Sequence, residues 1–269
     1  MAGPDSPRRD TRGIVDAAEL LARVRFRRRA PATALRPYLE HYWLIDWDLA
    51  EPYASHVVPH PSVNIVFQRH GTAPDFGEVS GIGLELFTQK LEATGRVCGI
   101  QFRPGGFRPF APAVPVSHWT GRRVLLDDAL PGHEAVPGAV LGPRDEDARV
   151  AALDAFLLSL APTPDPQAAR AAALADRIRH DRSILRVEDF ARSEGMSARS
   201  LQRLFAAYVG VSPKWVILRY RIHEALERAE SEAAVDWSAL AAELGYSDQA
   251  HLVRDFTATV GVPPTAYAS

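Results

Sequence analysis

Short stretches of alternating apolar and polar residues occupy the first half of the chain. They are rich in aromatic and β-branched residues and lie at 41–49, 63–68 and 96–102. This pattern is typical of β-strands that bury one face. Clusters of proline and glycine lie between them, for example at 51–52 and 104–106, and these clusters predict turns. We therefore expect a mostly antiparallel sheet or a small barrel.

The pattern changes to a helical one beyond residue 144. In residues 144–160 the apolar positions recur at spacings of three and four, which predicts one long helix. The segment 161–167 has three prolines in seven residues and predicts a linker. The pattern after it is helical throughout. The expected fold class is therefore α+β, with an N-terminal arm at 1–34, a β-rich domain at 35–160 that ends in a helix, a linker at 161–168 and an all-α domain at 169–269.

An internal repeat lies within residues 187–264. Val187, Ala191 and Gly195 recur fifty residues later as Trp237, Ala241 and Gly245. After the glycine the offset becomes fifty-one, and the residues at 201–213 recur at 252–264 as Leu, Arg, Phe, Val-Gly-Val and Pro at matching places. The repeated units indicate two structural units of one kind.

Each unit is predicted to form a short helix, a tight turn and a second helix. Gly195 suits the end of the first helix because glycine tolerates positive φ, and Ser197 is a good N-cap for the second. In the second unit Gly245 ends the first helix, and Ser247 or Asp248 caps the next. A connecting helix begins at Pro213 and runs to about residue 230, which gives it a length of roughly 27 Å. That length is near the ~34 Å between successive major grooves, so both units could bind one DNA site.

The second helix of each unit has a polar face opposite its apolar face. In the first unit the apolar face carries Leu201, Leu204, Phe205 and Tyr208, and the polar face carries Arg199, Gln202, Arg203 and Ala206. Arginine can form two hydrogen bonds with guanine, and glutamine can do the same with adenine. Such residues near the N-terminus of a helix suit a DNA major groove.

These motifs resemble the DNA-binding domain of AraC/XylS-type transcriptional regulators. The resemblance covers residues from about 169 to 269 and rests on S-x-R-x-L-Q-R-x-F from Ser197, on Arg221 and Ala225 in the connector, and on G-Y-x-D-x-x-H-x-x-R-x-F from Gly245. It implies DNA contacts at Ser197, Arg199, Ser200, Gln202, Arg203, Ser247, Gln249, Ala250, His251 and Arg254. Ala250 departs from the pattern because it offers no polar group, and Leu226-Glu227-Arg228 departs where the family often has an aliphatic pair.

The first half resembles a sensor-type domain of some members of this family. The matching phrases are HYW near Tyr42 and the segments 57–67, 99–110 and 115–122. This resemblance implies a role in effector binding or protein interaction without naming an effector. The implied partner is double-stranded DNA, and a small-molecule effector, a homodimer formed with help from the 144–160 helix, and a contact with RNA polymerase all stay open.

Net charge changes the picture only when it is divided along the chain. The whole chain carries −2, which by itself argues against a nucleic-acid partner. Residues 170–221 carry +6 and residues 222–269 carry −6, so the first unit has the charge expected of a DNA-binding surface and the second does not. Of the 31 basic residues 29 are arginines, which codon bias explains better than selection for phosphate binding.

Several other residue groups have simpler explanations than a chemical site. His56 and His60, with His41 or His70, lack the spacing of metal ligands, and neither a metal nor a cofactor is expected. Trp43, Ile45 and Trp47 share a strand face, for which core packing is favoured over a ligand platform. The glycines at 105–106 are expected in a tight turn rather than an anion site, and the single cysteine, Cys98, is expected to be buried.

The remaining features limit the class of protein. The longest apolar stretch is too short for a membrane helix, the N-terminus lacks the features of a secretory signal, and a single cysteine favours a reducing cytoplasm. We therefore expect a cytoplasmic, sequence-specific transcriptional regulator without catalytic residues. The alternatives are an enzyme with a catalytic β domain and a regulatory helical domain, which a pocket of convergent titratable groups would favour, and a regulator without an effector, which a filled barrel would favour.

The charge division predicts unequal roles for the two units. Arg203→Ala should weaken DNA binding more than Arg254→Ala, because Arg203 lies in the basic unit. Titration of both variants against the same duplex, at one salt concentration, measures the difference. An equal or larger loss for Arg254→Ala would contradict the prediction.

Overall fold

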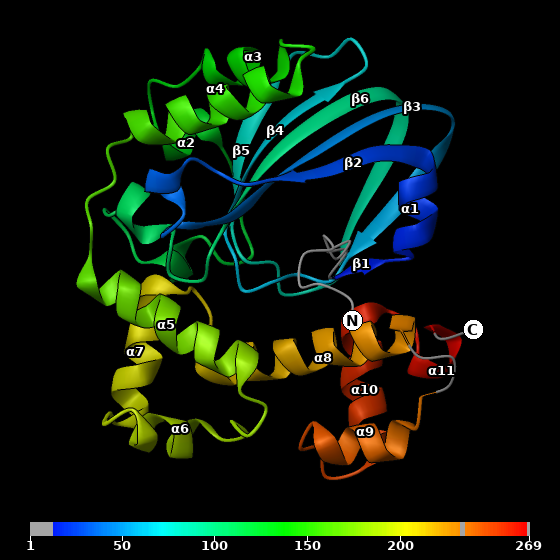
Figure 1. Cartoon of the computed structure of the whole chain (residues 1–269), viewed down its shortest axis with the longest axis vertical. Helices are drawn as coiled ribbons and strands as arrows, with labels where there is room; N and C mark the ends of the chain where they lie inside the picture. Colours follow the sequence, from blue (N-terminus) through cyan, green and yellow to red (C-terminus); the bar gives the residue numbers. More distant parts are fainter. Residues whose placement is uncertain (1–12, 232–234, 268–269) are drawn as a thin grey trace, which may run out of the picture.

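A computed structural model of the chain describes residues 13–231 and 235–267, and it places a β-sheet domain beside a helical domain (Figure 1). The strands are β1 (Ile14–Val15), β2 (Val24–Arg29), β3 (Leu39–Val57), β4 (Asn64–His70), β5 (Phe76–Ser80), β6 (Phe87–Phe102) and β7 (Arg123–Leu125). The helices of the sheet domain are α1 (Ala17–Arg23), α2 (Leu126–Ala129), α3 (Val136–Leu141) and α4 (Glu146–Ser159), with single 3-10 turns at Thr33–Leu35, Arg108–Phe110 and Val116–His118. The sheet-then-helices organisation confirms the predicted α+β fold class.

The seven strands form one antiparallel sheet in the order β1-β3-β6-β4-β5-β7, with β2 also paired to β3. The predicted strands at 41–49 and 96–102 are parts of much longer strands, β3 and β6. The turn predicted at 51–52 is wrong, because β3 passes through these residues with a shift of register between Leu49 and Tyr53. A bulge of this kind accommodates the proline without ending the strand.

The predicted N-terminal arm at 1–34 is also wrong over the part that the structure describes. From Gly13 onward the chain forms β1, α1 and β2, and β2 pairs with β3 from Val24 to Arg29. The arginine-rich sequence hides this strand because its arginines alternate between two faces. Arg27 and Arg29 reach carboxylates on α4, whereas Arg28 turns to the opposite face.

One face of the sheet is buried by α3 and α4. Leu153, Phe156 and Leu157 of α4 are buried there, and the ring of Phe156 meets that of Phe67 edge to face at a distance of 5.7 Å between ring centroids. The Tyr42 hydroxyl on β3 donates to Asp154 on α4 at 2.7 Å. The apolar face of α4 is therefore used inside the chain, and a homodimer would need another surface.

The helical domain contains α5 (Pro166–His180), α6 (Val187–Ser193), α7 (Ala198–Tyr208), α8 (Pro213–Ser231), α9 (Trp237–Glu243), α10 (Gln249–Val260) and α11 (Pro264–Tyr267). The predicted linker is shorter than 161–168, because α5 begins at Pro166. Proline is favoured in the first turn of a helix, and the side chain of Asp165 caps this one. The pairs α6–α7 and α9–α10 are the two repeated units, and α8 connects them (Figure 1).

The turn within each unit forms as its residues predict. Gly195 and Gly245 follow α6 and α9 with φ of 65° and 73°, a conformation that glycine adopts without steric cost. Ser197 caps α7 by accepting from the backbone N–H of Ser200 at 3.1 Å. Of the two candidates for the second unit, Asp248 is the cap, since it accepts from the backbone N–H of His251 at 2.8 Å.

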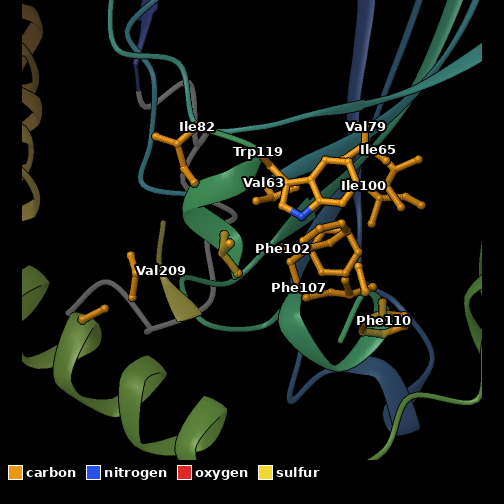
Figure 2. Close-up of a cluster of buried hydrophobic side chains, with 14 of the residues drawn as sticks. Val63, Ile65, Val79, Ile82, Ile100, Phe102, Phe107, Phe110, Trp119 and Val209 are labelled. Carbon is orange, nitrogen blue, oxygen red and sulfur yellow. The ribbon is translucent and has the colours of Figure 1, made fainter. Parts of the chain in front are cut away.

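The two domains share an apolar core. A single buried cluster runs from the sheet through Phe102, Phe107 and Trp119 to Val209 at the end of α7, and Figure 2 shows these side chains. At the other end of α8, Val15 and Val58 of the sheet domain join a second cluster with Leu226 and Phe256. Apolar contact at both ends of α8 fixes the helical domain against one end of the sheet.

Asp46 holds β2, β3, β6 and α4 together through charge. It accepts from Arg96 on β6 at 2.6 Å, pairs with Arg27 on β2, and lies 3.2 Å from Arg149 on α4, whose side chain is only 2% exposed. Burial by itself would raise the pKa of Asp46. The hydrogen bonds from Arg27 and Arg96 and the charge of Arg149 outweigh burial and hold that pKa below its ordinary value.

Asp46→Asn should lower the free energy of unfolding by about 2 kcal/mol, because it leaves the buried Arg149 without its carboxylate. The exposed Asp48→Asn, two residues along the same strand, is the matched control and should change little. Denaturant unfolding measures both. Because the pKa of Asp46 is lower in the folded state, its carboxylate stabilises the fold at pH values above the unfolded-state pKa of about 4. The difference in unfolding free energy between the wild type and Asp46→Asn should therefore shrink as the pH falls below that value. A difference that persists unchanged at pH 3 would contradict this account.

Candidate nucleic-acid interface and sheet cavity

The predicted DNA-contacting residues of the first unit lie at the surface of α7 and its cap. Arg199, Gln202 and Arg203 are exposed, while Leu201, Leu204 and Phe205 on the opposite face are buried. The sequence produces this arrangement because apolar residues recur every three or four positions and pack inward. The three polar side chains therefore form one outward row near the N-terminal end of the helix.

The guanidinium groups of this row are not committed to carboxylates. Among the residues that the structure describes, neither Arg199 nor Arg203 forms an ion pair. The neighbouring arginines outside α7 differ, since Arg177 pairs with Glu194 and Arg192 with Asp189 at 3.1 Å. The outward face of α7 thus keeps its positive charge available for an anionic partner.

The second unit places its predicted residues in the same way but with acidic neighbours. Gln249, Ala250 and Arg254 are exposed on α10, and His251 is partly exposed. His251 lies 3.8 Å from Asp255, and Asp248 stands at the N-terminus of the helix. The backbone N–H of His251 holds the pKa of Asp248 below its ordinary value, so this carboxylate carries a negative charge toward the side that would approach phosphates.

The serines named by the resemblance take part in the turns. The Ser197 hydroxyl lies 2.9 Å from that of Ser200, and both are at the N-terminus of α7. The Ser247 hydroxyl donates to Asp248 at 3.2 Å and lies 3.3 Å from Nδ1 of His251. These contacts fix the first turn of each helix. A direct role of the serines on DNA stays a prediction.

The two helices point the same way relative to the sheet domain. Figure 1 shows α7 and α10 at the two ends of α8, both extending away from the sheet, and the loops that precede them lie at the edge of the molecule farthest from the sheet. Their C-terminal ends contact the sheet domain instead. The Thr120 hydroxyl donates to the carbonyl of Gly210 after α7 at 2.7 Å, and a Cβ on Gly261 after α10 would lie 3.4 Å from Leu86. The N-terminal ends of both helices are thus free to meet one surface.

The second face of the sheet surrounds a cavity of about 620 Å³. Its wall includes alternate residues of β3, namely His41, Trp43, Ile45 and Trp47, which face away from α4. Trp47 is 5% exposed and packs in an apolar cluster with Val66, Leu91 and Val97, with Trp43 against it, which agrees with the core-packing interpretation. Both tryptophans also line the cavity, so the ligand-platform alternative stays a prediction. Strand alternation alone could not distinguish a filled face from a hollow one.

Each of these tryptophans lies over a glycine of the neighbouring strand. Trp43 pairs with Gly99 and Trp47 with Gly95, and a Cβ on either glycine would come within 1.9 Å of the indole ring. The absence of a side chain lets the ring lie flat on the strand. The Trp47 indole N–H donates to the carbonyl of Glu92 at 3.1 Å. In the described part of the chain, the Trp43 indole N–H has no such acceptor.

The remaining lining combines apolar side chains with a few polar ones. Phe26, Val66, Leu91 and Val97 extend the apolar surface, and Arg28, His41, Ser62, Asn64 and Gln101 lie together in the wall. Glu78 is occupied, because Gln68 donates to it at 3.0 Å and Arg123 at 2.9 Å. Within the described residues the side-chain amide of Gln101 forms no hydrogen bond, so it is a polar group that can serve a ligand.

The histidines, the glycine turn and the cysteine that the sequence analysis considered have structural roles. His56 lies 2.9 Å from the hydroxyl of Thr88, and His60 stacks on His223 of α8. Across residues 13–231 and 235–267, no three histidine, cysteine or acidic side chains are placed to hold a metal ion. Gly105 packs against the backbone of α5 at Ala168 and Ala172. Cys98 is fully buried, and burial raises the pKa of its thiol to about 11.

Comparison with known families bears on both domains. Residues 27–125 match a family described as a domain of unknown function (DUF6597), and residues 190–269 match a family described as a helix-turn-helix domain. The C-terminal domain is an AraC-type helix-turn-helix domain. This confirms the resemblance seen in the sequence, and the chain is accordingly a DNA-binding transcriptional regulator.

Several solved structures are similar to this chain at low sequence identity. The C-terminal domain of AraT, a response regulator from Geobacillus stearothermophilus, is 24% identical over 39% of this chain and 84% of its own, with a TM-score of 0.34. ToxT from Vibrio cholerae is 9% identical over 84% and 97%, with a TM-score of 0.46. ToxT of strain SCE256 bound to an unsaturated fatty acid is 14% identical over 89% and 96%, also at 0.46. Because these scores lie below 0.5, the assignment rests on the family match and the geometry.

Two further comparisons complete the description. No curated protein matches the chain in sequence. In the part of the chain that the structure describes, no helix combines the length and the apolar character needed to cross a membrane.

Proposed function

We propose that this regulator binds a specific DNA sequence through α7 and α10, and that a small molecule in the sheet cavity adjusts this binding. The outward row of Arg199, Gln202 and Arg203 carries the proposal, because it combines exposure, free positive charge and base-reading side chains at a helix N-terminus. The two arginines and the glutamine can each form paired hydrogen bonds with one base. The acidic neighbours on α10 make the second unit the one that binds DNA more weakly.

The cavity supports an effector rather than a purely protein-binding role for the sheet domain. A filled domain would favour a regulator without a small-molecule ligand, but the cavity of about 620 Å³ is large enough for one. Its chemistry suits a ligand with a flat aromatic ring, which would stack on Trp43. Acceptor groups on that ligand would face the Trp43 indole N–H and the Gln101 amide.

The enzyme alternative receives less support from the same wall. Two of the titratable groups in the wall have partners inside the chain, since Glu78 is held by Arg123 and Gln68 and the ring of His60 stacks on His223. The cavity therefore offers stacking and hydrogen bonding, and the regulator acts by binding alone with no covalent step.

Selection of bound duplexes from a random library tests the DNA-binding half of the proposal. The full-length chain should enrich one sequence motif. Arg203→Ala should relax the preference at one base position and weaken binding by about 1–3 kcal/mol, as expected for loss of a base-reading arginine. Arg192→Ala is the control, because Arg192 is an exposed arginine of the same unit outside α7. Failure of the wild type to enrich any motif would contradict sequence-specific binding.

Gly99→Ala tests the cavity. Its Cβ would lie 1.9 Å from the Trp43 ring, so the indole must leave its place and enter the cavity. Binding of the aromatic sulfonate 8-anilinonaphthalene-1-sulfonate, followed by fluorescence, should weaken by about tenfold, the equivalent of one lost stacking contact. Gly138→Ala is the control, since a Cβ there meets no atom within 4 Å. A folded Gly99→Ala variant with unchanged probe affinity would contradict the proposed site.

A further inference from the structure

One wall of the cavity is also the contact with the DNA-binding domain. Residues 81–87, which we name the strap, run from the end of β5 to the first residue of β6, and six of the seven line the cavity: Gly81, Gly83, Leu84, Glu85, Leu86 and Phe87. Leu84 and Phe87 are 50% and 37% exposed, unusual values for apolar side chains of their size. The cavity side of the strap is therefore an apolar surface that a ligand would cover.

The strap also contacts the helical domain at three separate places. Ile82 is fully buried and packs so closely on Gly210, after α7, that a Cβ there would lie 2.7 Å from it. The carbonyl of Leu84 accepts from Arg219 of α8 at 3.2 Å. Leu86 packs on the cluster of α8, α9 and α10, next to Gly261. Figure 2 shows Ile82 on the sheet-domain side and Val209 on the side of the first unit.

A second contact lies beside the strap. His60, in the cavity wall, stacks on His223 of α8 with ring centroids 4.0 Å apart, and Nε2 of His223 donates to the carbonyl of Pro59 at 3.3 Å. Pro59 in turn lies under Gly83 of the strap, where a Cβ would come within 3.1 Å. The connector helix is thus held by the same wall that encloses the cavity.

Arg219 makes this contact weak enough to change. Its side chain is buried, its guanidinium carbon lies 4.5 Å from the ring centroid of Trp215, and among the described residues its one hydrogen bond is to the carbonyl of Leu84 in the strap. Within the described residues its Nη1 has no acceptor and no carboxylate pairs with it. Burial of a cation without a counter-charge costs free energy. This cost offsets part of the stabilisation that the apolar contacts between the sheet domain and the helical domain contribute, and we call this contacting state the docked arrangement. Burial also lowers the pKa of Arg219 to about 10, which still leaves it charged at neutral pH.

We infer that the strap is the element that couples the cavity to DNA binding. In the docked arrangement it holds the C-terminal ends of α7 and α10, so that both helices present their N-terminal ends to one DNA surface. A ligand that covers Leu84 and Phe87 shifts the strap, and the three contacts shift with it. This inference rests on the proposed function, since it concerns how the same cavity acts on the same helices.

DNA affinity without any ligand gives the first test. Leu86→Ala and Ile82→Ala loosen the strap contacts and leave every DNA-facing residue in place, so both should weaken binding to the selected duplex by about fivefold or more, the range of ordinary coupling between sites. Leu153→Ala is the control, because Leu153 lies on α4, away from the strap, and is as fully buried as Ile82. Its DNA affinity should stay within about twofold of the wild type when it is measured well below the melting temperature of the variant. Leu86 is only partly buried, so that variant decides the matter if Ile82→Ala does not fold.

Linkage between the two ligands gives the second test. The affinity of 8-anilinonaphthalene-1-sulfonate is measured with and without the selected duplex, and in the wild type the two values should differ by about fivefold or more. The linkage measurement uses Ile82→Ala, or Ile82→Val if that variant does not fold, because Ile82 is not part of the cavity wall. Both ligands should still bind, but the ratio should approach one, whereas Leu153→Ala should keep it. An unchanged ratio in the Ile82 variant, or strap variants with wild-type DNA affinity, would overturn the inference.

The controls separate this result from failure of the proposed function. If the wild type selects no duplex, both proposals are overturned. If the sulfonate does not bind, the proposed cavity site is wrong, and the ligand-free DNA affinities of the strap variants still decide whether the strap holds the two helices.

Discussion

The two-sided pleat of β3 is the constraint on which the rest of the structure depends. Successive side chains of a strand point to opposite faces, so Tyr42, Leu44 and Asp46 meet α3 and α4 while Trp43 and Trp47 face the cavity. A slip of one residue would put Asp46 into the cavity and bury the tryptophans under α4. The guanidinium groups around Asp46 oppose such a slip, because a shift of one residue would bring Ile45 or Trp47, in place of a carboxylate, to these arginines.

That constraint also explains why the sheet domain can hold a cavity and remain firmly packed. The α4 side supplies the largest apolar cluster and the charge cluster, and a smaller buried cluster that includes Trp47, Val66 and Leu91 lies on the other face. There, glycines at 95 and 99 let two indole rings lie against the strand, and the space above them stays open.

The helical domain distributes its charge unevenly for a visible reason. Beside the first unit, Arg177 of α5 pairs with Glu194, whereas Arg199 and Arg203 on α7 form no ion pair among the described residues. Glu224 of the connector α8 and Glu243 of α9 bind Arg182, which precedes α6, and Glu243 also binds Arg228 of α8. Part of the acidic excess at the C-terminal end therefore serves contacts inside the helical domain, and the net charge of a segment overstates how much negative charge faces DNA.

The sequence by itself determined the parts of the molecule that local physics controls. The repeat, the glycines that end α6 and α9, the cap at Ser197 and the outward row on α7 all follow from helical periodicity and turn chemistry within a few residues. Contacts between distant segments decided the rest. Trp43 lies against Gly99, fifty-six residues later in the chain. The segment β2 forms a strand because its backbone pairs with that of β3. Residues 81–87 have no periodic pattern, yet they line the cavity and contact three parts of the helical domain. Only the folded chain brings these groups together, since such contacts depend on register and packing that no short window of sequence contains.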